Sequence, residues 1–249
     1  MIKFKLINTD YNIYSDVIEN LINNFSESGV IIKDSRNVIK SFESNKVIFN
    51  IKSFKIPNIF NAFIYNKIRL SKAERSYRFA QKLLSFGINT PEPIAYFEFK
   101  TSLFLKNSYY VSKNIDYDFS IRQVIKDSNF KNREKILKLF SRFTFKLHEN
   151  NINYLDHSPG NTLIQVYEND YRFYLIDLNR MEFKKMTFKN RMQNFNRLTV
   201  DPNIIRIFSE EYASLYNVDI ELVYKKMLFY SEKFFSDRDR LKKIKKFKF

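Results

Sequence analysis

The spacing of apolar and polar residues divides the chain into a strand-rich first part and a helix-rich second part. Residues 1–25 predict a short strand and then a helix, for which Ser15 is a plausible N-cap. Three short apolar runs follow at 30–33, 37–42 and 46–54, separated by the polar turns DSR and ESN. Their spacing predicts an antiparallel meander of three strands.

A helix and two further strands complete the first part. Segment 70–87 has helical periodicity, with Ser71 as a candidate N-cap and Gly87 at its end. Segments 90–99 and 102–113 are typical of strands. We expect the buried stripe of the helix to consist of Ala73, Tyr77, Ala80 and Leu84.

Helices dominate the second part. Apolar residues recur at helical spacing from 119 onward, most regularly over 132–148, and again from 186 to about 240. Between them, segments 162–167 and 171–177 flank the turn END and predict a hairpin. The pattern indicates an α+β chain: an N-terminal part with five antiparallel strands and one helix, and a mainly helical C-terminal part with one hairpin. We place the boundary between residues 1–112 and 113–249.

Composition narrows the class of protein. The 249 residues are 44% hydrophobic, which suffices for one large domain or two small lobes. The absence of cysteine excludes disulfides, cysteine metal sites and cysteine nucleophiles, and the two histidines argue against a zinc site. Neither a long apolar run nor an N-terminal signal peptide is evident, so we expect a cytoplasmic protein.

The net charge of +16 predicts an anionic partner, such as nucleic acid, an anionic membrane or a phosphorylated substrate. A general compositional bias toward lysine would give the same total. Seven of the last twelve residues, 238–249, are basic, and Leu241, Ile244, Phe247 and Phe249 interrupt them. This mixture suits an interface with anionic lipids, although a frayed, solvated end would have the same pattern.

Four polar residues suggest the chemistry. Lys52 lies late in the third strand of the meander, Asp156 and Asn161 flank the loop DHSPGN, and Asp177 ends a predicted strand. Phosphoryl transfer from ATP depends on positioning and on neutralising charge. Lys52 suits the α- and β-phosphates, Asp156 can orient an acceptor hydroxyl and take its proton, and Asn161 with Asp177 can hold a divalent metal such as Mg²⁺.

Gly160 is one of only three glycines in the chain. It follows Pro159 inside the candidate loop. We expect the two residues to let the chain turn tightly, so that Asp156 and Asn161 face the same site.

These motifs carry a family resemblance. The segment YLDHSPGN resembles the kinase catalytic loop, with the Asp-to-Asn spacing of five, and LIDLN resembles the metal-binding DFG segment. More closely, IKSFKIPN, SKAERSYRFAQKLLSFGINTPEPIAY, SYYVS and DHSPGNTLI together resemble the bacterial lipopolysaccharide core kinases. The resemblance covers roughly residues 30–180.

The resemblance implies a bilobal protein-kinase-like fold, with a small N-terminal antiparallel-sheet lobe carrying one helix and a mainly helical C-terminal lobe. It implies ATP and Mg²⁺, and phosphorylation of Kdo or heptose in the lipopolysaccharide inner core. The acceptor would be a lipopolysaccharide or lipid A–core glycolipid. The protein would then be cytoplasmic and peripheral to the inner face of the inner membrane, with the basic tail against the anionic surface.

The resemblance also implies roles in the first lobe. Backbone groups near Tyr110, Val111 and Lys113 would bind adenine as the hinge. Glu74 would orient Lys52, but Ser71 and Glu74 also have the spacing of a capping box, and related sequences carry their glutamate slightly later.

The chain departs from the kinase pattern in several places. It lacks a glycine-rich loop, and Arg36 is either a phosphate contact there or a hairpin-tip residue. Ser158 stands where protein kinases place a lysine that contacts the γ-phosphate, so another basic residue would have to compensate. Lys55 competes with Lys52 for the phosphate role, and we interpret His157 as a loop residue.

Three other functions stay open on the sequence. The departures are compatible with a non-catalytic kinase-like binding module, and the acceptor is open to a different small molecule or a protein. Charge alone suggests a nucleic-acid binder, but no binding motif supports it and the carboxylates would repel phosphate without metal. We therefore expect no nucleic-acid partner.

Overall fold

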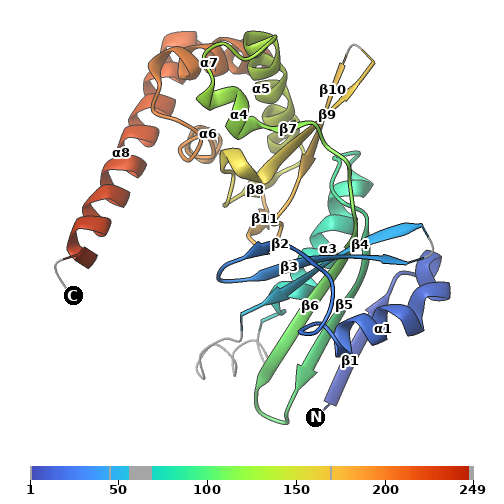
Figure 1. The fold of residues 1–249 in the computed structure, drawn as a ribbon. Helices are drawn as coiled ribbons and strands as arrows, with labels where there is room; N and C mark the ends of the chain where they lie inside the picture. The colour runs from blue at the N-terminus through green and yellow to red at the C-terminus, as the bar shows by residue number, and fades with distance from the viewer. Residues whose placement is uncertain (1, 45, 56–68, 169, 247–249) are drawn as a thin grey trace. The chain divides into compact units, whose positions relative to one another are not determined.

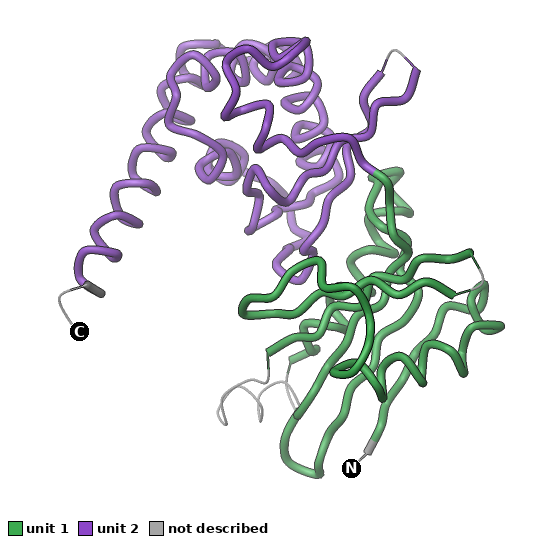
Figure 2. Tube along the Cα trace, in the orientation of Figure 1, with its two compact units in different colours: residues 1–116 green, residues 117–249 purple. Residues whose placement is uncertain are grey.

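The computed structural model describes residues 2–44, 46–55, 69–168 and 170–246 (Figure 1). The chain forms two compact units, residues 1–116 and 117–249 (Figure 2). The last residues of the basic tail, 247–249, lie outside the described residues, as does the end of the motif IKSFKIPN.

Unit 1 contains an antiparallel sheet of six strands in the order β1-β5-β6-β4-β3-β2. The predicted meander β2-β3-β4 is confirmed, and the two later strands are β5 and β6. The expected five strands are one too few, because the N-terminal strand pairs with β5 at the sheet edge. The strands are β1 Ile2–Ile7, β2 Val30–Asp34, β3 Val38–Ser44, β4 Val47–Phe54, β5 Pro93–Lys100 and β6 Leu105–Lys113.

The helices of unit 1 follow the predicted segments, with two local corrections. The first, α1 Ser15–Asn23, follows the 3-10 helix η1 Thr9–Tyr14, so Tyr14 and not Ser15 occupies the N-cap position. In α3 Lys72–Ser85, the predicted N-cap is confirmed, since the Ser71 hydroxyl accepts a hydrogen bond from the backbone of Glu74.

The end and the buried stripe of α3 can also be compared with the prediction. Gly87 follows the C-cap Phe86 with φ +63°, as expected of a glycine that ends a helix. The stripe includes Leu83, which is fully buried, in place of Leu84, which is 40% exposed.

The two faces of the sheet pack on different helices. Phe49 and Ile51 of β4 join the core cluster that contains Ile18 of α1. Phe54 packs in a separate cluster with Ala73 and Tyr77 of α3 and with Tyr96 and Tyr110. Because side chains alternate along a strand, Lys52 shares the face of Phe54, which α3 covers.

Unit 2 is mainly helical. The predicted helix 132–148 is confirmed as α5, and the region from 186 onward forms three separate helices, α6, α7 and α8. Apolar residues of α5, α7 and α8 make one buried cluster. The helices are α4 Ile121–Lys126, α5 Arg133–Glu149, α6 Phe188–Gln193, α7 Pro202–Tyr216 and α8 Ile220–Lys246.

The predicted hairpin of unit 2 is confirmed as β9 and β10, and β7 pairs with β9 on its other side. A second, two-stranded sheet pairs β8 with β11. Short strands of this kind carry little periodicity and were not predicted. The strands are β7 Phe119–Ser120, β8 Ile152–Tyr154, β9 Thr162–Tyr167, β10 Asp170–Leu175 and β11 Met181–Phe183.

The helix α8 continues into the basic tail as far as Lys246, so residues 238–246 are helical rather than frayed. Leu241 and Ile244 are exposed on it. Across the described part of the chain, no helix combines the length and apolarity needed to cross a bilayer.

A buried polar network joins the helices of unit 2 to β8. Asn194 donates from Nδ2 to the carbonyl of Tyr154 at 2.9 Å and to Asn153 Oδ1 at 3.1 Å. Its Oδ1 lies 3.1 Å from His148 Nε2, and His148 Nδ1 lies 2.7 Å from the Tyr212 hydroxyl. Since Asn194 Oδ1 can only accept, Nε2 of His148 carries a proton.

The second histidine has no such network. His157 is fully buried among the rings of Phe140, Tyr154 and Phe195. Neither ring nitrogen has a hydrogen-bond partner of normal geometry in the described ranges. Burial lowers the pKa of His157 to about 4 and that of His148 to about 3.

These histidines predict acid sensitivity. Both folded-state pKa values lie below the ordinary 6.5, so the unfolded chain takes up protons first as the pH falls. The free energy of unfolding should fall from about pH 6.5 through about pH 4, by up to about 1.4 kcal/mol per pH unit for each histidine. Urea denaturation at pH 7 and pH 5 measures this.

The variant His157→Leu should reduce the difference between pH 7 and pH 5, because leucine suits the apolar site and does not titrate. A pH dependence as steep as that of the wild type would contradict the assignment to His157.

Candidate active site

The predicted catalytic loop connects β8 to β9 through Asp156 and the 3-10 turn η2 Pro159–Asn161. Its backbone is closed by short-range hydrogen bonds. The amide of Ser158 donates to the carbonyl of Asp156 at 2.7 Å, and the amide of Asn161 donates to the carbonyl of Ser158 at 2.9 Å. The side chain of Asn161 donates to the carbonyl of Asp156 at 2.9 Å, so the two ends of the loop are in contact.

Tyr154 connects this loop to the segment that carries Asp177. Its buried hydroxyl donates to the carbonyl of Ile176 at 2.5 Å, and the amide of Ile176 donates to the carbonyl of Asn161 at 3.0 Å. Burial raises the pKa of Tyr154, the charges of Asp177 and Asp156 raise it further, and a hydrogen bond with Asn161 lowers it. Hydrogen bonds through Tyr154 and Ile176 therefore join the loop to the segment that carries Asp177.

Asp177 lies two residues after the end of β10, with φ +60°. A non-glycine residue in this left-handed region is uncommon and marks a position fixed by its surroundings. Its Oδ1 accepts a hydrogen bond from Asn179 Nδ2 at 2.6 Å.

Asn161 and Asp177 fit a magnesium ion chemically. Asn161 uses its amide nitrogen on the loop backbone, which leaves Oδ1 as an acceptor, and carboxylate and amide oxygens are the ligands that Mg²⁺ prefers. Within the described ranges, no cluster of three or more His, Cys, Asp or Glu residues has the arrangement of a metal site. A site with two protein ligands that substrate phosphates complete is the usual form for Mg²⁺.

Two arginines hold Asp156. Arg197 Nη1 lies 2.8 Å from Asp156 Oδ1, and Arg180 Nη1 lies 3.9 Å from the same oxygen. Arg197 also donates to the carbonyl of Leu155 at 3.0 Å, and its guanidinium lies over the Phe234 ring of α8. Both ion pairs involve Oδ1, and Oδ2 has no partner among the residues that the structure describes.

A polar cleft of about 240 Å³ lies beside Leu155, the residue before Asp156. Gln193 and Asn196 are half-buried in it, and their side-chain amides make no hydrogen bond within the described residues. The cleft is lined by Asn153, Tyr154, Leu155, Asn190, Gln193, Asn194, Asn196 and Arg197.

Lys52 belongs to unit 1. It is half-buried in β4, opposite Ile39 of β3 and Tyr110 of β6, and its Nζ lies 5.1 Å from the centre of the Phe54 ring. Lys55 is exposed, just after the strand. The register thus places Lys52, and not Lys55, within the sheet on the face that α3 covers.

Glu74 lies on α3 with a nearly buried side chain. Its Oε1 accepts from Arg78 Nε at 2.9 Å and lies 2.8 Å from Arg78 Nη2. Of the two hydrogen bonds of a capping box, the one from the Glu74 amide to the Ser71 hydroxyl is present. The Glu74 carboxylate contacts Arg78 instead of the Ser71 backbone. The Glu74 charge is also among the causes that raise the pKa of Tyr96, after burial.

The other predicted nucleotide contacts lie in β6 and at a hairpin tip. Tyr110 and Val111 are in register with residues of both β4 and β5, and the amide of Lys113 donates to the carbonyl of Glu92 at 2.9 Å. Arg36 is exposed in the bend between β2 and β3.

The structure gives Gly160 a role beyond the predicted tight turn. Its φ is not positive, so a left-handed turn does not require glycine here. A Cβ at this position would lie 2.3 Å from Nη2 of Arg122, on α4. Glycine is therefore needed for the close approach of the Arg122 guanidinium.

Sequence reasoning missed Arg122, Arg180, Arg197 and the amide cleft. Each lies far along the chain from Asp156 or on an element with little periodicity. The only sequence signal was the run of amides in RMQNFNR, residues 191–197, which resembles an ordinary polar helix end.

Comparisons with known proteins identify the family and the fold. The family model described as lipopolysaccharide kinase (Kdo/WaaP) family matches residues 58–218, more than half of the chain. The match extends beyond the expected limit at 180 and does not include the segment with Lys52 and Arg36. Among curated proteins, none matches the sequence of this chain.

Solved structures share the fold at low sequence identity. WaaP in complex with acyl carrier protein superposes with a TM-score of 0.63 at 14% identity, covering 94% of this chain and 97% of that chain. The Rio2 kinase–ADP/Mg²⁺–phosphoaspartate complex from Chaetomium thermophilum gives 0.49 at 13% identity, covering 85% and 65%. The fold is protein-kinase-like, and the chain belongs to the lipopolysaccharide kinase (Kdo/WaaP) family.

Proposed function

We propose that this protein is an ATP-dependent kinase that phosphorylates a sugar hydroxyl, of Kdo or heptose, in the inner core of lipopolysaccharide. Family membership supports a phosphotransferase that acts in the lipopolysaccharide core. The observation that supports the assignment of residues is the closed loop between Asp156 and Asn161, which Tyr154 and Ile176 join to the segment that carries Asp177.

In the proposed reaction, Asp156 Oδ2 accepts the proton of the acceptor hydroxyl, and the oxygen of that hydroxyl forms a bond to the γ-phosphorus of ATP. The bond from that phosphorus to the oxygen bridging the β-phosphate breaks, and ADP leaves with the electron pair. Arg197 and Arg180 hold Oδ1, which orients the carboxylate and leaves Oδ2 toward the acceptor.

Asn161 and Asp177 would hold Mg²⁺, which neutralises charge on the β- and γ-phosphates. In unit 1, we assign Lys52 to the α- and β-phosphates, because its strand register supports a fixed position. The remaining proposed roles are Glu74 as the residue that orients Lys52, Arg36 as a phosphate contact, and the end of β6 at Tyr110, Val111 and Lys113 as the adenine contact.

The amide cleft supports a sugar as the acceptor. Amide side chains both donate and accept hydrogen bonds, as sugar hydroxyls do, and those of Gln193 and Asn196 are unpaired within the described residues. The cleft adjoins Asp156 through Leu155 and Arg197. We assign it to the acceptor.

We place the protein at the inner face of the inner membrane. The helical end of α8 carries basic residues beside exposed Leu241 and Ile244, which supports contact with anionic lipid. An acyl carrier protein is a second candidate partner, since the relative WaaP was solved in complex with one.

The proposed base and metal ligand can be separated by experiment. Asp156→Ala should lower transfer of labelled phosphate from ATP to lipopolysaccharide by roughly a thousandfold or more, because the base is lost. It should still be stabilised by Mg²⁺-ATP in a thermal shift. Asp177→Ala should lose both transfer and this stabilisation, because metal binding is lost.

Near-normal turnover of Asp156→Ala would mean that the catalytic loop is wrongly assigned. A wild-type protein that Mg²⁺-ATP does not stabilise would favour the non-catalytic binding module.

Removing the unpaired amides tests the acceptor cleft. The double variant Gln193→Ala/Asn196→Ala should raise the KM for the lipopolysaccharide acceptor by roughly tenfold and leave the KM for ATP unchanged, because two neutral hydrogen bonds are lost. Asn203→Ala, an exposed amide on α7, is the matched control. An acceptor KM equal to that of the control would remove the cleft from the acceptor site.

Deleting residues 238–249 tests the membrane role. The truncation begins after Phe234, which contacts Arg197, so the catalytic loop keeps its support. The truncated protein should bind phosphatidylglycerol liposomes much more weakly, because each lost basic residue near the surface removes about 1 kcal/mol of binding free energy. Co-sedimentation with the liposomes measures this binding, and ATP hydrolysis should persist. Unchanged binding to anionic liposomes would refute a role for the tail.

A further inference from the structure

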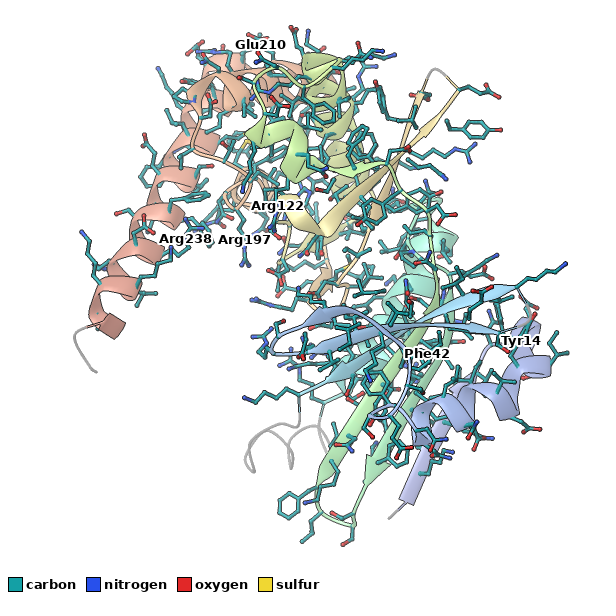
Figure 3. The ribbon with its side chains drawn as sticks, viewed as in Figure 1. Tyr14, Phe42, Arg122, Arg197, Glu210 and Arg238 are labelled. Atoms are coloured by element: carbon teal, nitrogen blue, oxygen red, sulfur yellow. The ribbon has the colours of Figure 1, made fainter. Side chains whose placement is uncertain are left out.

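Arg122 brings a positive charge to the catalytic loop from a neighbouring helix. It is the second residue of α4, and its guanidinium occupies the space beside Gly160, where a Cβ would lie 2.9 Å from its Cζ. Gly160 stands directly before Asn161 and four residues after Asp156. The guanidinium is therefore in contact with the segment that joins the proposed base to the proposed metal ligand. Figure 3 labels Arg122 with its side chain drawn.

This guanidinium is also unpaired. Arg122 is exposed and makes no ion pair or hydrogen bond with any residue that the structure describes. Other arginines of unit 2 have acidic partners: Arg142 with Glu211, Arg191 with Glu149, Arg197 with Asp156, and Arg206 with Glu221. A cation that lies beside the loop without a counter-ion has its donors available to an oxyanion.

The loop itself lacks such a cation. Ser158, two residues after Asp156, is a neutral side chain, and no residue from Asp156 to Asn161 is Lys or Arg. The two arginines that reach Asp156 are engaged with its carboxylate and, for Arg197, with the carbonyl of Leu155. Arg122 is thus the guanidinium at this loop that remains unpaired in the described part of the chain.

We propose that Arg122 is a catalytic residue that binds a phosphate-type oxyanion at the catalytic loop. This assignment rests on the proposed kinase function. The oxyanion is either the phosphoryl group in transfer or an anionic group of the acceptor, since both offer the same oxygens to a guanidinium. Gly160 belongs to the same proposed binding site, because its lack of a side chain leaves the space in which the Arg122 guanidinium lies.

Kinetic constants of Arg122→Ala, Arg122→Lys and Lys126→Ala test the proposal. Arg122→Ala should lower kcat/KM for phosphate transfer to lipopolysaccharide by about tenfold or more, because a charged donor is lost from the reacting phosphate or the acceptor. Arg122→Lys should recover part of the loss. Lys126→Ala is the matched control, because it removes one exposed positive charge from the same helix.

The pattern of loss identifies the source of the oxyanion. A fall in kcat, repeated in ATP hydrolysis without acceptor, assigns Arg122 to the phosphoryl group. A rise in the acceptor KM alone assigns it to an anionic group of the acceptor. Kinetic constants of Arg122→Ala equal to those of Lys126→Ala, in transfer and in hydrolysis, would overturn the proposal.

The variant Gly160→Ala tests the position of the Arg122 guanidinium independently. Its methyl group would meet only the end of the flexible Arg122 side chain, so the variant should fold and displace the guanidinium. It should reduce activity in the wild-type background and have little further effect in Arg122→Ala. An equal loss in both backgrounds would mean that Gly160 acts without Arg122.

ATP hydrolysis measured without an acceptor tests the role of Arg122 independently of the proposed acceptor. If the wild type hydrolyses ATP but transfers nothing to lipopolysaccharide, the acceptor assignment fails. The comparison of Arg122→Ala with Lys126→Ala in hydrolysis then decides the role of Arg122: a specific loss supports it, and equal rates overturn it.

Discussion

The candidate site depends on one buried side chain, Asn194. Both of its amide hydrogens and its oxygen are engaged: Nδ2 donates to Tyr154 and Asn153 of β8, and Oδ1 accepts from His148 of α5. In a dry interior, each of these bonds resists displacement because an unpaired group would cost about 1–3 kcal/mol. Asn194 therefore fixes β8 against the helical core. Tyr154, at the end of β8, then fixes both the catalytic loop and the segment before Asp177.

Local patterns in the sequence predicted most of the fold. Strand alternation and turn residues gave the meander β2-β3-β4, and helical periodicity gave α3 and α5, since each signal arises within a few residues. The N-terminal strand was expected, but its pairing with β5 is a long-range contact that periodicity does not encode. The prediction that Ser15 caps α1 was wrong, because the 3-10 helix η1 runs directly into α1. Ser15 is therefore the first residue of the helix and Tyr14 occupies the N-cap position.

The sequence suggested Asp156, Asn161 and Asp177 because their spacing resembles that of a known catalytic loop, and in the structure Tyr154 and Ile176 link the segments that carry them. It did not predict the basic residues around them. Arg122, Arg180 and Arg197 come from three separate segments, and only tertiary structure brings Arg180 and Arg197 to Asp156 and Arg122 to Gly160. Gly160 illustrates the difference. Its rarity marked it as important, yet a turn was the natural interpretation, whereas the structure requires glycine for space beside a side chain from α4.

The arrangement of charge at the loop has a consequence for the acceptor. Asp156 is compensated by Arg197 and Arg180 on one oxygen, so the loop does not present an isolated carboxylate to an approaching anion. The uncompensated Arg122 adds positive potential on the Gly160 side, and the whole chain carries +16. Attraction of an anionic acceptor is thus compatible with the proposal that the Asp156 carboxylate is the base, because Arg197 and Arg180 offset the repulsion that a bare carboxylate would exert. A neutral acceptor would gain nothing from this arrangement, whereas phosphate-bearing or carboxylate-bearing glycolipids would.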